Sequence, residues 1–299
     1  MSFDRSAYGG VWVPLVTPFR RDSLDLEALE RLVEWLLGRG VHGFVALGST
    51  GEAPHLSEEE SLQVVRCIVA RVAGRVPVLV GSGRASTHQT LRAIERFAEA
   101  GAAATLVLTP FYYRAQMQAA QLRHHYEQLA RESPLPLFVY HFPQVTGLDL
   151  QPELLAEIAQ HPNVWGFKDS SATGGPLAAA LQRLSTRAFV GSAGRIVEAL
   201  EAGACGGILA VANLVPVACV QLVASWRAGE RARAAALQEA VARVAAPLRG
   251  CAIAAIKSGL AHRGHPVGIP RAPLAPASVE LATRIAEALD VALRETGGS

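Results

Sequence analysis

GFVALG, residues 43 to 48, is an apolar run that ends at a glycine and is followed by apolar residues at helical spacing. Apolar residues then follow at the spacing of one face of an α-helix: Leu62, Val65, Ile68 and Val69. A strand that is apolar at nearly every position is typical of a parallel sheet covered on both faces. The stretch therefore predicts a strand and then a helix, the repeating unit of α/β folds.

The same unit recurs along the rest of the chain. Helical spacing follows each further apolar run, and these runs cover residues 10–19, 77–82, 104–110, 136–141, 164–170, 188–192 and 206–212. The corresponding helices are expected from Leu26 to Leu36, Thr87 to Ala100, Gln118 to Glu132, Pro152 to Gln160, Leu177 to Leu184, Ile196 to Ala202 and Val217 to Trp226. This alternation predicts a (β/α)8 TIM barrel. A doubly wound sheet fits the sequence less well. Such sheets usually carry a glycine-rich fingerprint, and the nearest candidate, GSGRAS (residues 81 to 86), lacks the third glycine.

The alternation stops after Gly229. Residues 230–249, 251–262 and 277–293 have the composition and spacing of helices, and no strand-like run separates them. We therefore predict a catalytic barrel over residues 1–228 and a helical C-terminal region over residues 229–299.

The net charge, the N-terminal sequence and the spacing of the cysteines exclude several classes of protein. The net charge is +2, and no basic tail or stripe is present that would neutralise the phosphates of a nucleic acid. The N-terminal sequence MSFDRSAYGG lacks the apolar segment of a signal peptide, so we expect a cytoplasmic protein. The cysteines lie far apart without a CxxC pair, and we expect reduced packing residues at Cys67, Cys205, Cys219 and Cys251.

Residues 203 to 226 carry no charge and are long enough to span a bilayer. Asn213, Pro216 and Gln221 argue against a membrane span. A buried strand, a turn and the first turns of a packed helix give the same pattern, and this is the interpretation we adopt, with no membrane partner.

The active site of such a barrel lies at the C-terminal ends of its strands. The polar residues that close the apolar runs are therefore candidates: Thr17, Ser49, Thr50, Glu52, Ser82, Thr109, Tyr112, Tyr140, His141, Lys168, Asp169, Ser170 and Ser192. The histidines are scattered and no HExxH motif occurs, so we expect no metal site.

Lys168 is one of only two lysines, although the chain has 28 basic residues. Arginine stays protonated in proteins, whereas a desolvated lysine can lose its proton and attack a carbonyl carbon to form a Schiff base. A lysine kept at a strand end therefore indicates a nucleophile. The alternative is a structural salt bridge with Asp169. The other lysine, Lys257, lies in the helical C-terminal region and is interpreted as structural.

Two further features lie at neighbouring strand ends. Tyr140 is expected on the strand beside Lys168, where its phenol could move protons at a carbinolamine; the alternative is a core tyrosine. GSTGE, residues 48 to 52, has backbone donors and hydroxyls that could hold a carboxylate, and a plain strand-to-helix turn is the alternative.

In its motifs the chain resembles the pyruvate-dependent class I aldolases and lyases typified by dihydrodipicolinate synthase and N-acetylneuraminate lyase. The matching motifs occur in order at the expected strand ends: GSTGE, TPFYY (109–113), YHFPQVTG (140–147), GFKDSS (166–171), VGSAG (190–194) and GGILAVAN (206–213). The resemblance implies a substrate that is pyruvate or a pyruvate-derived keto acid, and no cofactor.

The resemblance also implies roles for individual residues. Lys168 would form the imine and Tyr140 would act as general acid and base. Ser49 and Thr50 would bind the keto acid carboxylate, with Thr50 also part of a hydroxyl relay that Tyr112 completes from a neighbouring subunit. The pocket around the imine would be lined by Gly191 and Ile208. The family usually forms homotetramers that are dimers of dimers, and we expect the same assembly.

The substrate depends on finer details. Dihydrodipicolinate synthases usually carry an arginine where this chain has Val145, which weakens the reading as a synthase that joins pyruvate to aspartate semialdehyde, although Arg114 could supply the charge. TPFYYRAQM, HHY (124–126) and VTGLDL (145–150) resemble the 4-hydroxy-2-oxoglutarate aldolases, which release pyruvate and glyoxylate. In that subgroup Ser170 and the pair Gly191 and Ser192 have counterparts, while Thr50 is more typical of the synthases. The sequence favours the aldolase.

Two other classes of protein are weighed against a Schiff-base lyase. GSAGR, residues 191 to 195, lies where some barrel isomerases bind phosphate, but such an enzyme leaves Lys168 and Tyr140 without a joint role. A non-catalytic sensor on the same fold is disfavoured because the candidate catalytic residues are intact.

Overall fold

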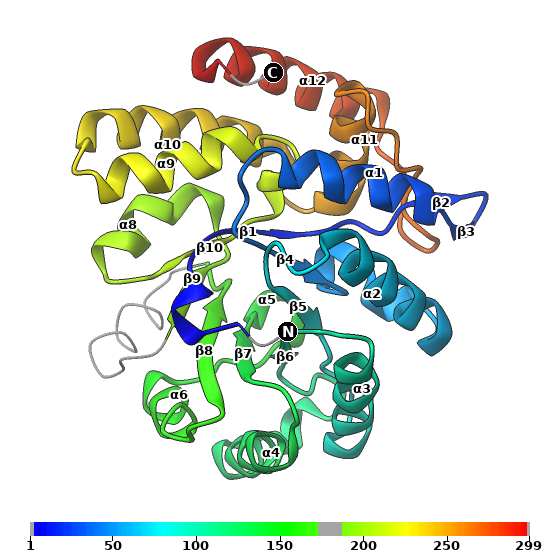
Figure 1. Cartoon of the computed structure of the whole chain (residues 1–299), viewed down its shortest axis with the longest axis vertical. Helices are drawn as coiled ribbons and strands as arrows, with labels where there is room; N and C mark the ends of the chain where they lie inside the picture. Colours follow the sequence, from blue (N-terminus) through cyan, green and yellow to red (C-terminus); the bar gives the residue numbers. More distant parts are fainter. Residues whose placement is uncertain (1–2, 173–186, 298–299) are drawn as a thin grey trace.

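The chain folds into a closed barrel of eight parallel strands surrounded by helices, which confirms the TIM barrel (Figure 1). The computed structural model describes residues 3–172 and 187–297. Around the barrel the order is β1, β10, β9, β8, β7, β6, β5 and β4. The bounds are β1 Gly10–Pro14, β4 Gly43–Ala46, β5 Val78–Gly81, β6 Ala104–Leu108, β7 Leu137–His141, β8 Val164–Asp169, β9 Arg187–Val190 and β10 Gly206–Ile208.

The helices lie close to their predicted positions. Their bounds are α1 Leu26–Leu37, α2 Glu58–Val72, α3 Thr87–Glu99, α4 Ala119–Glu132, α5 Pro143–Thr146, α6 Pro152–Ile158, α8 Ile196–Glu201, α9 Pro216–Arg227, α10 Arg231–Ala245, α11 Ala252–His262 and α12 Val279–Thr296. The helix predicted over residues 177–184 falls outside the described residues. Local sequence sets some of the starts: α2 begins with a capping box, in which the Ser57 hydroxyl accepts from Glu60 N and the Glu60 carboxylate accepts from Ser57 N.

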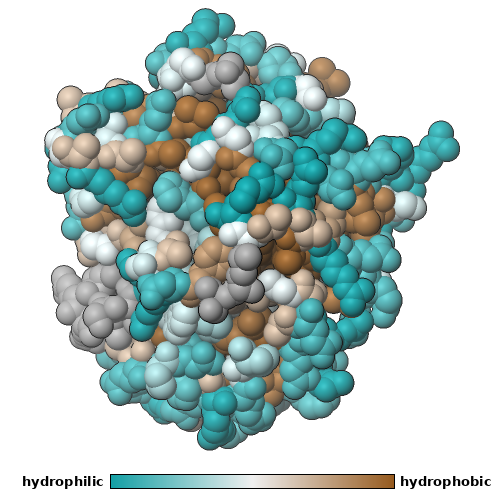
Figure 2. All heavy atoms as spheres, in the orientation of Figure 1, coloured by the Kyte–Doolittle hydropathy of each residue, from teal (hydrophilic) through white to brown (hydrophobic). Residues whose placement is uncertain are grey.

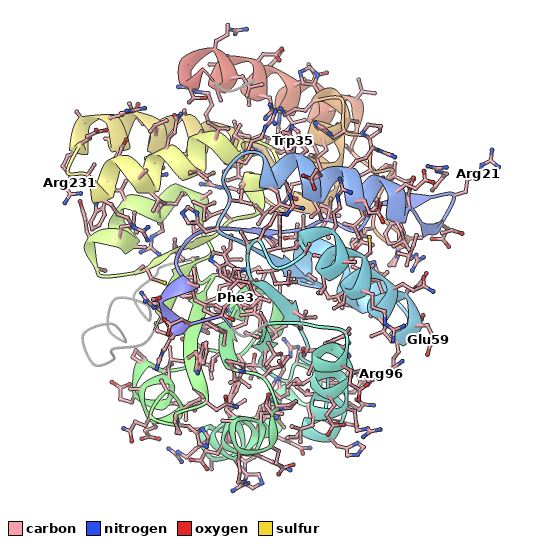
Figure 3. All side chains as sticks on the ribbon, viewed as in Figure 1. Phe3, Arg21, Trp35, Glu59, Arg96 and Arg231 are labelled. Atoms are coloured by element: carbon pink, nitrogen blue, oxygen red, sulfur yellow. The ribbon has the colours of Figure 1, made fainter. Side chains whose placement is uncertain are left out.

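The first apolar run is shorter as a strand than the sequence predicts. β1 ends at Pro14, and Phe19–Arg20 (β2) and Ser23–Leu24 (β3) form a separate hairpin. Proline donates no ladder hydrogen bond, so it ends the parallel pairing. Arg21 and Asp22 both have positive φ, as a tight two-residue hairpin turn requires. Arg21 lies at the tip of this hairpin, at the edge of the molecule (Figure 3).

Side chains inside the barrel form a cluster distinct from the layer between strands and helices. The inner cluster consists of Tyr8, Trp12, Val45, Leu79, Ala104, Leu106, Phe138, Tyr140, Phe189 and Ile208. Tyr8 stacks on Trp12 and Phe138, with ring centroids 5.4 and 5.3 Å apart. Phe3 packs against this cluster and lies over the barrel centre in the view of Figure 3. The N-terminal segment thus covers one end of the barrel.

The helical C-terminal region packs directly on the barrel. Figure 1 shows α10 alongside α9, with α11 and α12 near α1. Trp35 of α1 packs on His265, with ring centroids 4.4 Å apart, and the guanidinium of Arg263 lies 5.0 Å from the Trp35 ring centroid. The boundary at residue 229 stays a prediction.

The uncharged segment 203–226 is the buried strand, turn and helix that the sequence predicts. It contains β10, a short turn over Ala210–Asn213 and α9. Within the described residues, no single helix is both long and apolar enough to cross a membrane. One pair of consecutive helical segments, Arg231–Leu248 and Ala252–His262, is together long and apolar enough, but the two segments are bent by 117° relative to each other. In Figure 2 hydrophilic residues cover most of the outer helices, and hydrophobic residues show mainly between them.

The four cysteines are free thiols, and the prediction that all of them are packing residues is wrong for one. Cys219 is buried in α9, whereas Cys251 is exposed just before α11. Cys251 follows exposed Arg249 and Gly250 at the end of the connection between α10 and α11, although buried Leu248 and Ala254 lie three residues away on either side in the sequence.

His125 should make the protein less stable in mild acid. Its imidazole is buried on α4, with Nδ1 2.8 Å from Thr87 Oγ1, and burial, assisted by the charge of His124, lowers its pKa from 6.5 to about 4. Between these two pH values the unfolded chain binds a proton that the folded chain does not, so the free energy of unfolding falls as the pH falls. The shift corresponds to about 3 kcal/mol.

Urea denaturation at both ends of this pH range measures the effect. The loss of stability in acid should shrink in His125→Gln and stay unchanged in His88→Gln, because His88 is an exposed histidine on the neighbouring helix α3. Equal acid sensitivity in both variants would contradict the assignment to His125.

Candidate active site

Lys168 and Tyr140 lie side by side at the C-terminal ends of neighbouring strands. β7 and β8 pair in parallel with Tyr140 opposite Lys168, and both side chains are buried. Lys168 Nζ lies 4.1 Å from the centroid of the Tyr140 ring. The electron-rich ring face stabilises an ammonium, and the same arrangement keeps a phenol next to an amine that could attack a carbonyl carbon.

Lys168 and Asp169 do not form the salt bridge that was the structural alternative for this lysine. Successive side chains of a strand point to opposite faces, so Lys168 lies with the inner residues and Asp169 lies on the helix side. Asp169 instead faces His141, whose Nδ1 is 2.9 Å from Oδ1, and accepts hydrogen bonds from Ser171 N and Oγ. Burial by itself raises the pKa of Asp169, but the hydrogen bonds from His141 and Ser171 outweigh it and hold the pKa below its usual value.

His141 links β7 and β8 to the segment that follows β7. Its Nε2 lies 2.8 Å from Asp149 Oδ1, so each ring nitrogen faces a carboxylate. The two carboxylates fix the orientation of the imidazole ring between β8 and the segment after β7. The sequence marks His141 as a polar strand end, but nothing in it indicates Asp149 as its partner.

Gly191 allows Ser170 to lie next to Lys168. A Cβ on Gly191 would lie 1.9 Å from Ser170 Oγ and 3.1 Å from Lys168 Cε. Backbone hydrogen bonds hold this arrangement, since Ser170 N donates to His141 O and Gly191 N donates to Asp169 O. Ile208 belongs to the inner cluster with Tyr140, and Ser192 follows Gly191, half-buried. The structure therefore brings Tyr140, Lys168, Ser170 and Gly191 together.

Replacing Gly191 by alanine should slow imine formation at Lys168 by about ten- to a hundredfold, because the added methyl displaces both neighbouring side chains and small misplacements of reacting groups are costly. Gly194→Ala is the matched control, since a Cβ there meets nothing within 4 Å. The rate of pyruvate trapping by cyanoborohydride measures the effect. Equal rates in the two variants would contradict the packing argument.

Ser49 and Thr50 lie at the same end of the barrel, on the turn after β4. In the strand order β4 is opposite β8, four strands away in either direction. The turn is a short 3-10 helix over Ser49–Gly51, and Thr17 Oγ1 donates to Gly51 O across 2.6 Å. Within the described residues, the hydroxyls of Ser49 and Thr50 take part in no hydrogen bond with the protein. Both hydroxyls are thus available to a ligand.

Tyr112 is not brought to Lys168 within the chain. Its side chain is 71% exposed and packs edge-to-face on Tyr113. Val145 is also exposed, and a Cβ on Gly147 would lie 2.5 Å from a guanidinium nitrogen of Arg114. Arg114 therefore lies against the segment that carries Val145.

The described residues contain no group of three or more His, Cys, Asp or Glu side chains that could hold a metal ion.

Comparison with known proteins identifies related sequences and structures over nearly the whole chain. The model of the dihydrodipicolinate synthetase family matches residues 7–292. A 4-hydroxy-tetrahydrodipicolinate synthase from Xanthomonas axonopodis pv. citri is 39% identical over 287 residues, 93% of each chain. The crystal structure of dihydrodipicolinate synthase from Thermotoga maritima superposes with a TM-score of 0.91 at 30% identity and covers 98% of this chain and 100% of that one.

A third relative was solved with a ligand. It is a prophage protein of the dihydrodipicolinic acid synthase family from E. coli K12, in complex with pyruvate, with a TM-score of 0.91 at 28% identity. The superposition covers 95% of this chain and 98% of that one.

Proposed function

The chain belongs to the dihydrodipicolinate synthetase family of carbon–carbon lyases that act through a lysine Schiff base, and we propose that Lys168 is that lysine and pyruvate its substrate. The observation that carries the proposal is the pairing of Lys168 with Tyr140, whose ring centroid lies 4.1 Å from Nζ. A buried lysine can act as a nucleophile once it has lost its proton, and a neighbouring phenol can exchange protons with the intermediates.

The reaction follows from these positions. Neutral Nζ of Lys168 attacks C2 of pyruvate, and Tyr140 supplies the proton with which the carbinolamine oxygen leaves as water. The Tyr140 phenolate then takes the proton of a C3–H bond while the protonated imine accepts the electrons of that bond, which gives an enamine. C3 of the enamine attacks the carbonyl carbon of an aldehyde, and the aldehyde oxygen takes a proton from Tyr140. In the reverse direction Tyr140 takes the proton of the C4 hydroxyl, the imine accepts the electrons of the C3–C4 bond, and the aldehyde leaves. Hydrolysis frees Lys168 in either direction.

The remaining residues are proposed to bind the keto acid. The hydroxyls of Ser49 and Thr50, which take part in no hydrogen bond among residues 3–172 and 187–297, are suited to its carboxylate, and Thr50 also to a proton relay. Ser170 and Ser192 offer hydroxyls near the imine, and the backbone of Gly191 and Ile208 would line its pocket.

For the aldehyde we propose aspartate semialdehyde, so that the enzyme is a 4-hydroxy-tetrahydrodipicolinate synthase. Two observations support this choice: relatives that match most of the chain carry this name, and Arg114 lies against Gly147, where it offers a guanidinium to a second carboxylate in place of the missing arginine at Val145. The sequence motifs favour a 4-hydroxy-2-oxoglutarate aldolase, but these relatives are named as synthases and do not support that prediction. Exposed Val145 keeps that reaction as the second candidate.

We also propose that Tyr112 acts in a neighbouring subunit of a homotetramer. Phe111, Tyr112 and Tyr113 are consecutive and exposed, and a second copy of the chain could cover them.

Parallel assays test the substrate. The protein is mixed with pyruvate and aspartate semialdehyde, and loss of pyruvate is measured with lactate dehydrogenase and NADH; in a second assay release of pyruvate from 4-hydroxy-2-oxoglutarate is followed in the same way. Lys168→Arg serves as the blank in both. Pyruvate consumption that depends on the semialdehyde supports the synthase, release in the second assay alone supports the aldolase, and neither activity in protein that traps no pyruvate contradicts the function.

A further inference from the structure

We propose that Lys257 is a positioning residue for the keto acid carboxylate. By pairing with Glu52, it holds the turn that carries Ser49 and Thr50 in the geometry that binds pyruvate. This inference rests on the proposed function, because it assumes that these two hydroxyls bind the carboxylate.

The turn ends in a conformation that its sequence does not favour. Glu52 has φ 56° and ψ 32°, in the left-handed region that residues other than glycine rarely adopt. Its side chain is fully buried. A residue with a Cβ keeps such a conformation only where its surroundings hold it there. The contacts of Glu52 therefore determine the shape of the turn.

The two shortest contacts of the Glu52 carboxylate come from the C-terminal region, and His55 Nδ1 lies farther away, 3.6 Å from Oε2. Lys257 Nζ, on α11, lies 2.6 Å from Glu52 Oε1, and Glu52 Oε2 accepts a hydrogen bond from Arg271 N across 2.8 Å. Lys257 also donates to Ile269 O across 3.0 Å and lies 4.4 Å from the centroid of the Phe19 ring. Lys257 thus joins the turn, the hairpin and the segment after α11 at one buried point.

The surroundings of Lys257 explain why this position holds a lysine. An ammonium is a compact charge with three donors, whereas a guanidinium is larger and planar. Burial lowers the pKa of Lys257, and the carboxylate of Glu52 opposes that change. A buried carboxylate that loses the cation paired with it is strongly destabilising, so loss of Lys257 should displace Glu52 rather than leave it in place.

Backbone hydrogen bonds within the turn couple the position of Glu52 to the positions of the Ser49 and Thr50 hydroxyls. Glu52 N donates to Ser49 O, and Gly51 N donates to Gly48 O. Thr17, in the segment between β1 and β2, donates to Gly51 O, as described above. A shift of Glu52 would therefore move Ser49 and Thr50, whereas Lys168 is on the opposite strand of the barrel.

Trapping with two carbonyl compounds tests this inference. Sodium cyanoborohydride reduces the imine at Lys168 to a stable amine, and peptide mapping identifies the modified lysine. Pyruvate has a carboxylate and acetaldehyde has none. In Lys257→Met the concentration of pyruvate for half-maximal trapping should rise about tenfold or more, as expected when a hydrogen bond to a charged group is lost. Trapping with acetaldehyde should keep its rate.

Two further variants separate positioning from stability. Glu52→Gln keeps the shape of the side chain and removes its charge; because Lys257 can then lose its proton, this variant should fold and show the same shift for pyruvate. Leu129→Ala makes a cavity in α4, away from the turn, and should lower stability without changing half-saturation by pyruvate.

The possible results are distinct. A rise in half-saturating pyruvate with unchanged acetaldehyde trapping in either Glu52→Gln or Lys257→Met supports the inference. Unchanged half-saturation, or an equal loss with both compounds, overturns it. If the wild-type protein traps no pyruvate at Lys168, the proposed function itself fails.

Discussion

Lys168→Arg should abolish trapping of pyruvate and all turnover while the barrel stays folded. Arginine keeps the positive charge and the long aliphatic stem, and a guanidinium can still lie over the Tyr140 ring. It does not lose its proton at accessible pH, so it forms no imine. The expected loss is complete because no other group in the reaction replaces the nucleophile.

The composition of the chain makes this experiment unusually clear. Lys168 and Lys257 are its only lysines, so a reduced adduct can be assigned to one of two side chains or to the N-terminus. Circular dichroism and thermal unfolding should match the wild-type protein. Retained trapping in Lys168→Arg, with the adduct elsewhere, would move the nucleophile away from β8.

Tyr140→Phe should lower turnover by roughly two to four orders of magnitude, the range for loss of a general acid and base. Phenylalanine keeps the ring that stacks on Phe142 at 5.6 Å and lies beside Lys168 Nζ. The packing and the environment of the amine are therefore preserved, and only the hydroxyl is lost. Imine formation should become slower and remain detectable.

Steady-state turnover and single-turnover trapping measure the two effects separately. Tyr113→Phe is the matched control, since it removes a hydroxyl from an exposed tyrosine near the same end of the barrel. Normal turnover in Tyr140→Phe would contradict its role. A complete loss of trapping would indicate that the hydroxyl also maintains the position of Lys168.

The fold could be predicted because its signals are local. Apolar runs such as residues 43–48 and 136–141 predict strands that are buried on both faces, and helical spacing predicts helices with one buried face. Each of these patterns lies within a single strand or helix. The pairing of Tyr140 with Lys168 could also be predicted, because consecutive strands of a parallel barrel are neighbours and their C-terminal ends lie together. The early end of β1 at Pro14 was missed because a run of apolar residues continues through the turn.

The sequence by itself determined the barrel, the nucleophile candidate and its phenolic neighbour. The tertiary structure alone decided how the buried charges at the barrel pair. It separated Lys168 from Asp169, since adjacent strand residues point to opposite faces, and it joined His141 to Asp149 and Glu52 to Lys257. These pairs depend on how helices and loops pack around the barrel. No local period encodes such contacts, because their partners come from elements that meet only after folding.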